Sequence, residues 1–116
     1  MLNQFSRTEL LFGKAAMEKL ASSRVAVFGI GGVGGYTCEA LVRSGVGAFD
    51  LIDDDKVCLT NLNRQIIATR KTVGKYKVDV MEERIHDTTR TARSPLTNAF
   101  ICRRRKMILI FPSIPM

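Results

Sequence analysis

A glycine-rich stretch that follows a short apolar run constrains the fold of this chain more than any other feature. Residues 25–28 are apolar and include two valines, and Gly29, Gly31 and Gly34 follow them with the spacing G-x-G-x-x-G. Such a run is typical of a strand buried on both faces, and the glycines favour a tight turn into a helix. Because glycine has no side chain, backbone N–H groups and the positive end of that helix can approach a phosphate. The stretch predicts a nucleotide-binding turn, with a glycine turn that binds no ligand as the alternative.

A triplet of aspartates follows the next apolar segment. The Ser-Gly-Val-Gly turn at 44–47 is expected to end the helix, and residues 48–52 predict a second short strand. The triplet, which begins at Asp53 and ends at Asp55, lies about 20 residues after the glycines, where a dinucleotide fold places a carboxylate that binds ribose hydroxyls. A solvated turn is the alternative, and the upstream glycines favour ribose binding for Asp53.

Two further features follow the triplet. Residues 60–65 contain two asparagines and Arg64, whose rigid guanidinium can pair with phosphate oxygens. The last expected element is a helix over residues 73–87, and three residues form its apolar stripe: Val78, Met81 and Ile85. Lys77 in this helix is open to two interpretations, a solvated surface lysine or a phosphate contact.

An amphipathic arm precedes the glycine-rich stretch. Ser6 and Glu9 have the spacing of a capping box, which predicts a helix that begins there. Gly13 is expected to interrupt this helix, and the serines at 22–23 to end it. Arg7 lies at its start, and the residues alone favour a solvated arginine.

Charge and composition change after Asp87. The chain has 116 residues and a formal net charge of +7, but residues 88–116 hold six basic residues, no acidic one and all three prolines. The other 12 basic and 11 acidic residues leave residues 1–87 nearly neutral, which argues against a DNA-binding domain. We divide the chain into a helical arm (1–23), a nucleotide-binding part (24–87) and a basic tail (88–116) that we expect to be disordered.

Cysteine usage and hydropathy exclude several classes of protein. Cys38, Cys58 and Cys102 form no C-x-x-C pair, which indicates neither a zinc site nor a disulfide framework, and no metal-ligating set is predicted. No charged leader precedes an apolar segment, and the apolar run 107–111 is far shorter than the roughly 20 residues that cross a bilayer. We therefore expect a cytoplasmic protein without a membrane partner.

Four motifs in register resemble the adenylating domain shared by the ThiF, MoeB and HesA proteins and the ubiquitin-activating enzymes. They are the glycines of 29–35, D-x-D-x-V at 53–57, T-N-L-N-R-Q at 60–65 and V-G-x-x-K at 73–77. Within that superfamily, the segments 5–13, 43–47 and 57–61 look most like the tRNA threonylcarbamoyladenosine dehydratases. The resemblance covers residues 5–87.

The resemblance implies an α/β fold, namely the N-terminal part of a Rossmann-like, doubly wound, mostly parallel sheet with an N-terminal helical arm. It also implies that a carboxylate attacks the α-phosphate of ATP, pyrophosphate leaves, and an internal nucleophile closes a ring on the acyl-adenylate. In the dehydratases this carboxylate belongs to a threonylcarbamoyl group on a tRNA adenosine. Mg²⁺ is implied as well, but the family's magnesium aspartate lies in a D-A-x-D pattern that this chain does not contain.

The same resemblance implies roles for residues of the four motifs. The glycines lie in the phosphate-facing turn, Asp53 holds the ribose, and Lys77 neutralises phosphate charge. Arg7 resembles an arginine that one subunit of a homodimer lends to the ATP site of its partner, and with Arg64 and Lys77 it makes up the implied catalytic set. The residues implied to bind ATP are Gly29, Gly31, Gly32, Gly34, Asp53, Asp55, Asn61, Arg64 and Lys77.

Other functions stay open at this point. The residues T-T-R after Asp87 do not match the family's I-N-P, and the loss of one nucleotide converts one into the other. We therefore hypothesise a frameshift that leaves a truncated, inactive form. The alternatives are an adenylyltransferase for a ubiquitin-like sulfur carrier, a nicotinamide-dependent oxidoreductase fragment, and a nucleotide- or RNA-binding fragment whose cations at 103–106 contact phosphates.

Overall fold

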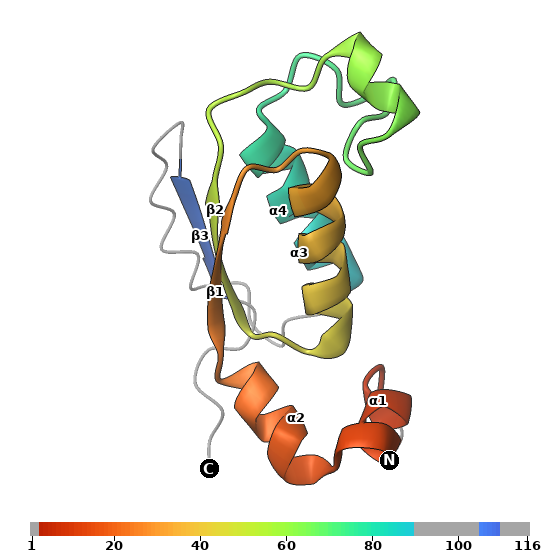
Figure 1. Ribbon diagram of the computed structural model, residues 1–116, viewed down its shortest axis with the longest axis vertical. Helices are drawn as coiled ribbons and strands as arrows, with labels where there is room; N and C mark the ends of the chain where they lie inside the picture. The colour runs from red at the N-terminus through yellow and green to blue at the C-terminus, as the bar shows by residue number, and fades with distance from the viewer. Residues whose placement is uncertain (1–2, 90–104, 110–116) are drawn as a thin grey trace.

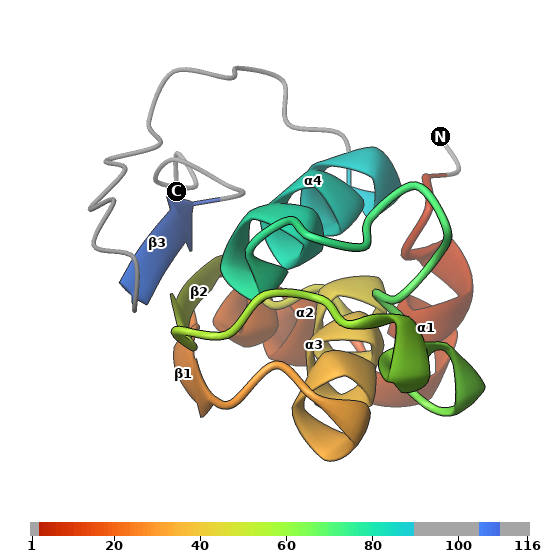
Figure 2. The same cartoon turned by 90° about the horizontal axis from the view of Figure 1, so that it is seen from above.

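The computed structural model describes residues 3–89 and 105–109, which form one three-stranded sheet and its covering helices (Figure 1). The elements in chain order are α1 (Ser6–Phe12), α2 (Lys14–Ala21), β1 (Arg24–Phe28), α3 (Gly32–Ser44), β2 (Ala48–Ile52), the 3₁₀ helix η1 (Leu59–Asn63), α4 (Lys77–Thr88) and β3 (Arg105–Leu109). Helices α3 and α4 lie on one face of the sheet (Figure 2). The fold is therefore α/β, as expected.

Strands β1 and β2 are parallel, with α3 as their crossover helix. Their register pairs Arg24 with Ala48 and Phe28 with Ile52, so both strands end at the same edge of the sheet. This arrangement is the β-α-β unit that the glycine-rich stretch predicts. The loops after β1 and β2 therefore meet at one end of the molecule.

Strand β3 differs from expectation. It pairs antiparallel with β2, opposite Ala48 at one end and Ile52 at the other, and the strand order is β1-β2-β3. Strand β3 therefore covers the edge of β2 that β1 leaves open. The proline-containing, charged composition of residues 88–116 predicts disorder. It does not predict β3, because the partner of this strand lies more than 50 residues away in the sequence.

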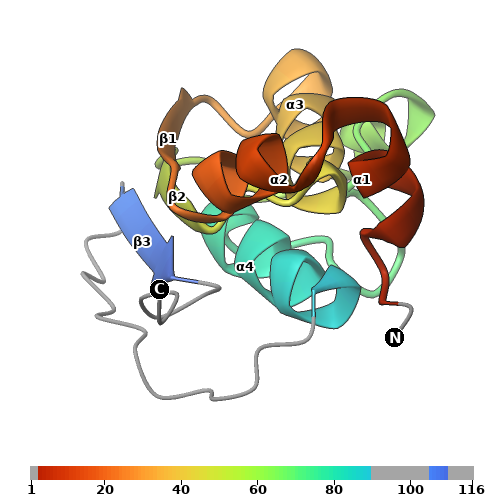
Figure 3. The ribbon, with the colours of Figure 1, turned by 90° about the horizontal axis from the view of Figure 1, so that it is seen from below.

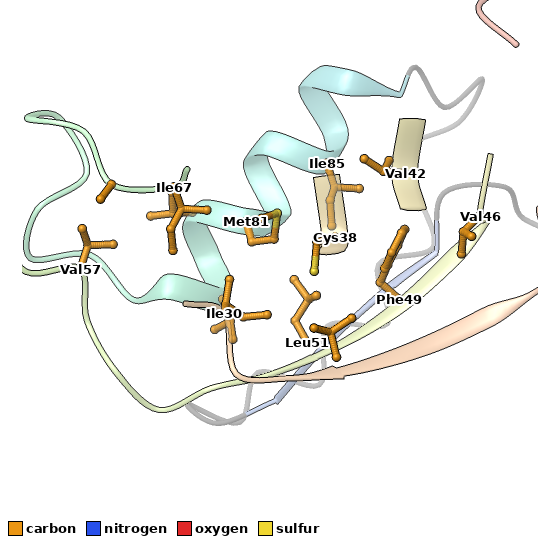
Figure 4. Packing of buried hydrophobic residues seen from close by; sticks show 14 residues of the cluster. Ile30, Cys38, Val42, Val46, Phe49, Leu51, Val57, Ile67, Met81 and Ile85 are labelled. Carbon is orange, nitrogen blue, oxygen red and sulfur yellow. The ribbon is translucent and has the colours of Figure 1, made fainter. Parts of the chain in front are cut away.

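The hydrophobic core lies between the sheet and helices α3 and α4 (Figure 4). The predicted stripe of α4 is confirmed, because its three residues are buried: Val78, Met81 and Ile85. Phe49 and Leu51 of β2 and Cys38 of α3 are fully buried against them. Complete burial of one such apolar side chain stabilises a fold by about 1.5–3 kcal/mol, so this layer holds the two helices on the sheet.

The arm formed by α1 and α2 packs beneath the C-terminal ends of α3 and α4 (Figure 3). Gln4 Nε2 donates a hydrogen bond of 3.2 Å to the carbonyl oxygen of Thr88, at the end of α4. A Cβ atom at Gly45, which ends α3 with φ +108°, would lie 3.2 Å from the side chain of Met17. The arm is therefore at the end of the molecule away from the loops that follow β1 and β2.

The boundaries of the arm helices confirm one prediction and correct another. Gly13 separates α1 from α2 with φ +86°, and α2 ends at Ala21, before the two serines. The capping box is wrong, because Ser6 Oγ accepts the N–H of Asn3 and no side chain caps α1. Within the described ranges, no helix has both the length and the hydropathy to cross a membrane.

Candidate functional site

The turn between β1 and α3 depends on glycine at two positions. Gly29 has φ +88°, a conformation that other residues rarely adopt. A Cβ atom at Gly34 would lie 1.6 Å from the carbonyl oxygen of Gly29, so α3 can approach the end of β1 only without a side chain there. At Gly32 a Cβ atom would have no neighbour within 4 Å, and no side chain caps the N-terminus of α3. An uncapped helix N-terminus with open space before it is suited to an anion.

Asp53 ties this turn to the end of β2. One carboxylate oxygen accepts the N–H of Ile30 at 2.7 Å, and the other accepts the N–H of Asp55 at 2.7 Å. Gly29 N–H also donates to the carbonyl of Ile52 at 2.8 Å. A carboxylate oxygen can accept two hydrogen bonds, and each oxygen of Asp53 accepts one here. Asp53 can therefore still accept hydrogen bonds from ribose hydroxyls.

The aspartate triplet is the one group of clustered carboxylates found among residues 3–89, and its ligand atoms lie within 4.8 Å of one another. Carboxylate oxygens are the ligands that Mg²⁺ prefers. However, Asp53 already holds two backbone N–H groups, and Asp54 and Asp55 are exposed. The donor chemistry of the triplet suits Mg²⁺, but no observation of the structure assigns the ion to it.

Asn61 holds the loop that follows the triplet. Its side-chain oxygen accepts the N–H of Cys58 at 2.8 Å, and its own N–H donates to the carbonyl of Cys58 at 3.0 Å. The side chain is buried, and its NH₂ group is left to donate elsewhere. Asn61 thus shapes the 3₁₀ helix η1 whether or not it contacts phosphate.

Lys77 occupies the first position of α4 because the preceding residues pair with the loop after β2. Val57 N–H donates to Lys75 at 2.8 Å, Gly74 N–H donates to Val57 at 2.9 Å, and Lys77 N–H donates to Asp55 at 3.0 Å, each to a backbone carbonyl. Gly74 has φ +89°. The predicted helix over 73–87 therefore begins four residues late, and Lys77 lies at its N-terminus.

An open cavity of about 620 Å³ brings several predicted residues together. Its lining includes Asp55, Asn61, Arg64 and Lys77. The glycine turn is next to it, since a Cβ atom at Gly31 would lie 3.6 Å from the side-chain nitrogen of Gln65, a further lining residue. Residues of all four motifs therefore lie at the end of the molecule where β1 and β2 end.

Two predicted site residues of this cavity, Arg64 and Lys77, are cations without a carboxylate partner among the described residues. Arg64 is exposed, and its guanidinium donates hydrogen bonds to oxygens of Asn63 (2.9 Å) and Thr60 (3.3 Å). Lys77 is 7 % exposed, and no ion pair within the described part of the chain includes it. Unpaired cations that share a cavity favour an anionic ligand, because charge-assisted hydrogen bonds are strong.

Gln65 was not selected from the sequence, although it lies within the T-N-L-N-R-Q motif. The side chain is buried, and its oxygen has no hydrogen-bond partner within residues 3–89 and 105–109. A buried polar atom without a partner costs about 1–3 kcal/mol, so a ligand that donates to this oxygen would be favoured. The sequence signal that could have selected Gln65 is its position directly after Arg64 in this motif.

Arg7 is not brought to the cavity of its own chain. It is exposed on α1, in the arm that packs under the C-terminal ends of α3 and α4 (Figure 1). Helix α3 has 13 residues and is therefore about 20 Å long, and the glycine turn lies at its other end. An arginine side chain does not span this distance.

Comparisons with known proteins found relatives that match most of this chain. The tRNA threonylcarbamoyladenosine dehydratase of Bacillus subtilis is 56 % identical over 87 residues, which are 75 % of this chain and 34 % of the relative. The dehydratase of Escherichia coli is 45 % identical over 84 % of this chain and 37 % of its own length. The crystal structure of E. coli TcdA in complex with ATP superposes with a TM-score of 0.72 at 49 % identity, over 73 % of this chain and 35 % of that one. This chain spans about a third of the length of these relatives.

More distant structures share the fold. E. coli MccB with ATP has a TM-score of 0.71 at 31 % identity, over 76 % of this chain and 28 % of that one. The model of the ThiF family matches residues 5–105, so the match continues beyond Asp87, where the motifs had led us to expect it to stop. The match covers most of the chain, and the protein belongs to the ThiF family.

Proposed function

We propose that this protein binds ATP in the cavity at the ends of β1 and β2, as the first step in the adenylation of a carboxylate. The unpaired cations Arg64 and Lys77 carry the proposal, because they line one open cavity next to the glycine turn. In this arrangement the N-terminus of α3 binds phosphate, and Asp53 binds the ribose. The structures of E. coli TcdA with ATP and with AMP support this choice of nucleotide.

The proposed carboxylate is the threonylcarbamoyl group of a tRNA adenosine, and the overall reaction is an ATP-dependent dehydration. The support is the identity of 56 % and 45 % to two tRNA threonylcarbamoyladenosine dehydratases. Arg64 and Lys77 would stabilise the charge that develops on the phosphates as pyrophosphate leaves. Bound Mg²⁺ would supply further charge neutralisation.

Arg7 has a role in this proposal only within a homodimer, in which the arm of one subunit reaches the cavity of the other. Three exposed apolar residues next to Arg7 support such a contact: Leu10, Leu11 and Phe12.

A second candidate acts on a protein carboxylate in place of tRNA. It is supported by a probable molybdopterin-synthase adenylyltransferase of Gracilaria tenuistipitata, which is 37 % identical over 63 % of this chain. Both candidates use ATP in the same cavity. They differ in whether the protein binds tRNA.

The ATP site is tested by calorimetric titration of the protein and of Arg64→Ala and Lys77→Ala with ATP. Each lost charge-assisted hydrogen bond is worth about 1.5–3 kcal/mol, so the Kd is expected to rise about 10- to 100-fold in each variant. Arg70→Ala is the matched control, because it removes one exposed positive charge that does not line the cavity. Equal ATP affinity in all four proteins would overturn the site.

A further inference from the structure

Positive charge gathers in one segment of the fold. Residues 56–78, here called the basic segment, contain six Lys or Arg residues and no Asp or Glu: Lys56, Arg64, Arg70, Lys71, Lys75 and Lys77. The rest of residues 1–87 holds the other six basic residues together with all 11 acidic ones. A segment of one sign in an otherwise acidic body creates a local field that attracts a polyanion.

The basic segment surrounds the candidate ATP cavity. It forms the green loops at the top of Figure 1, at the end of the molecule where β1 and β2 end. Its two ends are joined, since Lys56 and Tyr76 form an isolated β-bridge and the Lys56 ammonium lies 5.0 Å from the centre of the Tyr76 ring. The loop is therefore closed at its base and carries its charges as one surface.

Arg70, Lys71 and Lys75 are the exposed cations of this loop that do not line the ATP cavity. The ion pairs of residues 3–89 involve other side chains, so these three cations are unpaired within that part of the chain. The turn that bears them is held by hydrogen bonds, because Thr72 Oγ1 accepts the N–H of Thr69 at 2.8 Å and donates to the carbonyl of Ile67 at 2.8 Å. These cations are therefore exposed on a turn whose backbone is held by hydrogen bonds.

A second open cavity, of about 610 Å³, lies beside this turn. Lys71 and Lys75 line it, and so do two arginines that both bind Glu39. Two carboxylates on α4, Glu83 and Asp87, form part of its wall, so a polyanion would lie on the loop side. Lys75 borders this cavity while Lys77 borders the ATP cavity, which makes the two cavities neighbours.

We propose that Arg70, Lys71 and Lys75 bind the phosphate backbone of the tRNA whose adenosine is modified in the adjacent cavity. This inference rests on the proposed function. A tRNA brings one reacting carboxylate to the ATP and carries a phosphate on every flanking nucleotide, so the surface around the cavity has to compensate that charge. Within one subunit, the exposed lysines Lys14 and Lys19 lie on the arm, at the opposite end of the molecule from this cavity (Figure 1).

The test compares two double variants that each lose two exposed positive charges. Lys71→Ala/Lys75→Ala alters the basic segment, and Lys14→Ala/Lys19→Ala alters the arm. Binding of a fluorescein-labelled tRNA transcript is measured by anisotropy between 50 and 200 mM salt. For Lys71→Ala/Lys75→Ala we expect the Kd to rise about tenfold at low salt. The logarithm of the association constant falls as the logarithm of the salt concentration rises, and we expect the magnitude of this slope to decrease by about two. For the arm variant we expect a Kd within about twofold of that of the unaltered protein and the same salt slope.

Further measurements separate failure of this inference from failure of the proposed function. Lys71→Gln/Lys75→Gln keeps a polar side chain but removes the positive charge, so it is expected to behave as the alanine variant does. Thermal unfolding verifies that both variants are folded. Equal loss in the arm variant, an unchanged salt slope, or no tRNA binding by the unaltered protein would overturn the inference while ATP binding stands. Binding of tRNA through these lysines without binding of ATP would overturn the proposed function alone.

Discussion

The carbonyl oxygen of Gly29 occupies the space where residue 34 would carry a side chain, whereas the space before Gly32 is open. The two glycines therefore act differently, one in packing and the other in access to the phosphate. Gly34→Ala is expected to lower the free energy of unfolding by at least about 1–3 kcal/mol, because α3 must move away from β1. Gly32→Ala is expected to change it by less than about 1 kcal/mol, since a methyl group there meets no atom of the protein.

Chemical denaturation and ATP titration of the two glycine variants test this difference. Gly32→Ala should weaken ATP binding in a fully folded protein, because its methyl group lies where a phosphate approaches the helix N-terminus. The unaltered protein serves as the reference in both measurements. A Gly34→Ala variant as stable as this reference would contradict the close approach of α3 and β1.

At the scale of elements, Glu39 joins α3, which begins in the glycine turn, to α4, which begins at Lys77. One of its carboxylate oxygens accepts Arg84 Nε of α4 at 2.6 Å, and the other accepts Arg43 Nε of its own helix at 2.7 Å. Burial acts to raise the pKa of Glu39, but the hydrogen bonds and charges of Arg84 and Arg43 outweigh it and hold that pKa below its usual range. Stabilisation from this group is therefore present above the pKa of about 4.3 in the unfolded chain and is lost as pH falls through the folded-state pKa.

Glu39→Gln is expected to lower the free energy of unfolding by about 1–2 kcal/mol at pH 7, because both arginines are partly exposed and retain some solvation. It should also flatten the loss of stability below pH 4. Urea unfolding between pH 3 and pH 7 measures both effects. Glu18→Gln, an exposed carboxylate on the arm, is the control and is expected to leave the curve unchanged. A Glu39→Gln curve parallel to that of the unaltered protein would show that Glu39 does not join the helices.

Local patterns could predict most elements, because each carries its own signal. The glycine spacing predicted the β1–α3 turn, and the stripe of Val78, Met81 and Ile85 predicted the buried face of α4. The start of α4 was missed because residues 73–76 pair with the loop after β2, a contact between distant segments. The partnerless oxygen of Gln65 was missed for the same reason, since whether a buried group finds a partner is decided by the assembled fold.

At the scale of the whole molecule, the pairing of β3 with β2 is the feature that composition hid. The remainder of residues 88–116 lies outside the described ranges, so their expected disorder, and the frameshift hypothesised after Asp87, stay predictions. The same holds for the boundaries at 23 and 87. The residues of the candidate site all precede the end of α4, whereas the sheet includes β3 from the tail.

The distance between Arg7 and the cavity makes the homodimer testable through ATP binding. Arg7→Ala and Lys77→Ala each damage a different half of the composite site, so each variant alone is expected to bind ATP weakly. When the two are mixed and subunits exchange, one site of each mixed dimer combines an intact arm with an intact cavity. Calorimetry of an equimolar mixture should then recover high-affinity binding at about one site in four, because half of the dimers are mixed and each has two sites.

Two controls define what this mixture shows. Sedimentation of the unaltered protein should reveal a dimer, and Leu10→Ser/Leu11→Ser, which removes exposed apolar surface beside Arg7, should shift it toward monomer. The same substitutions placed in both mixing partners should abolish the recovery. If the mixture binds no better than its components while the protein is dimeric, the arm does not complete the partner's site. Arg7 then has no part in ATP binding, because within its own chain it is about the length of α3 away from the glycine turn.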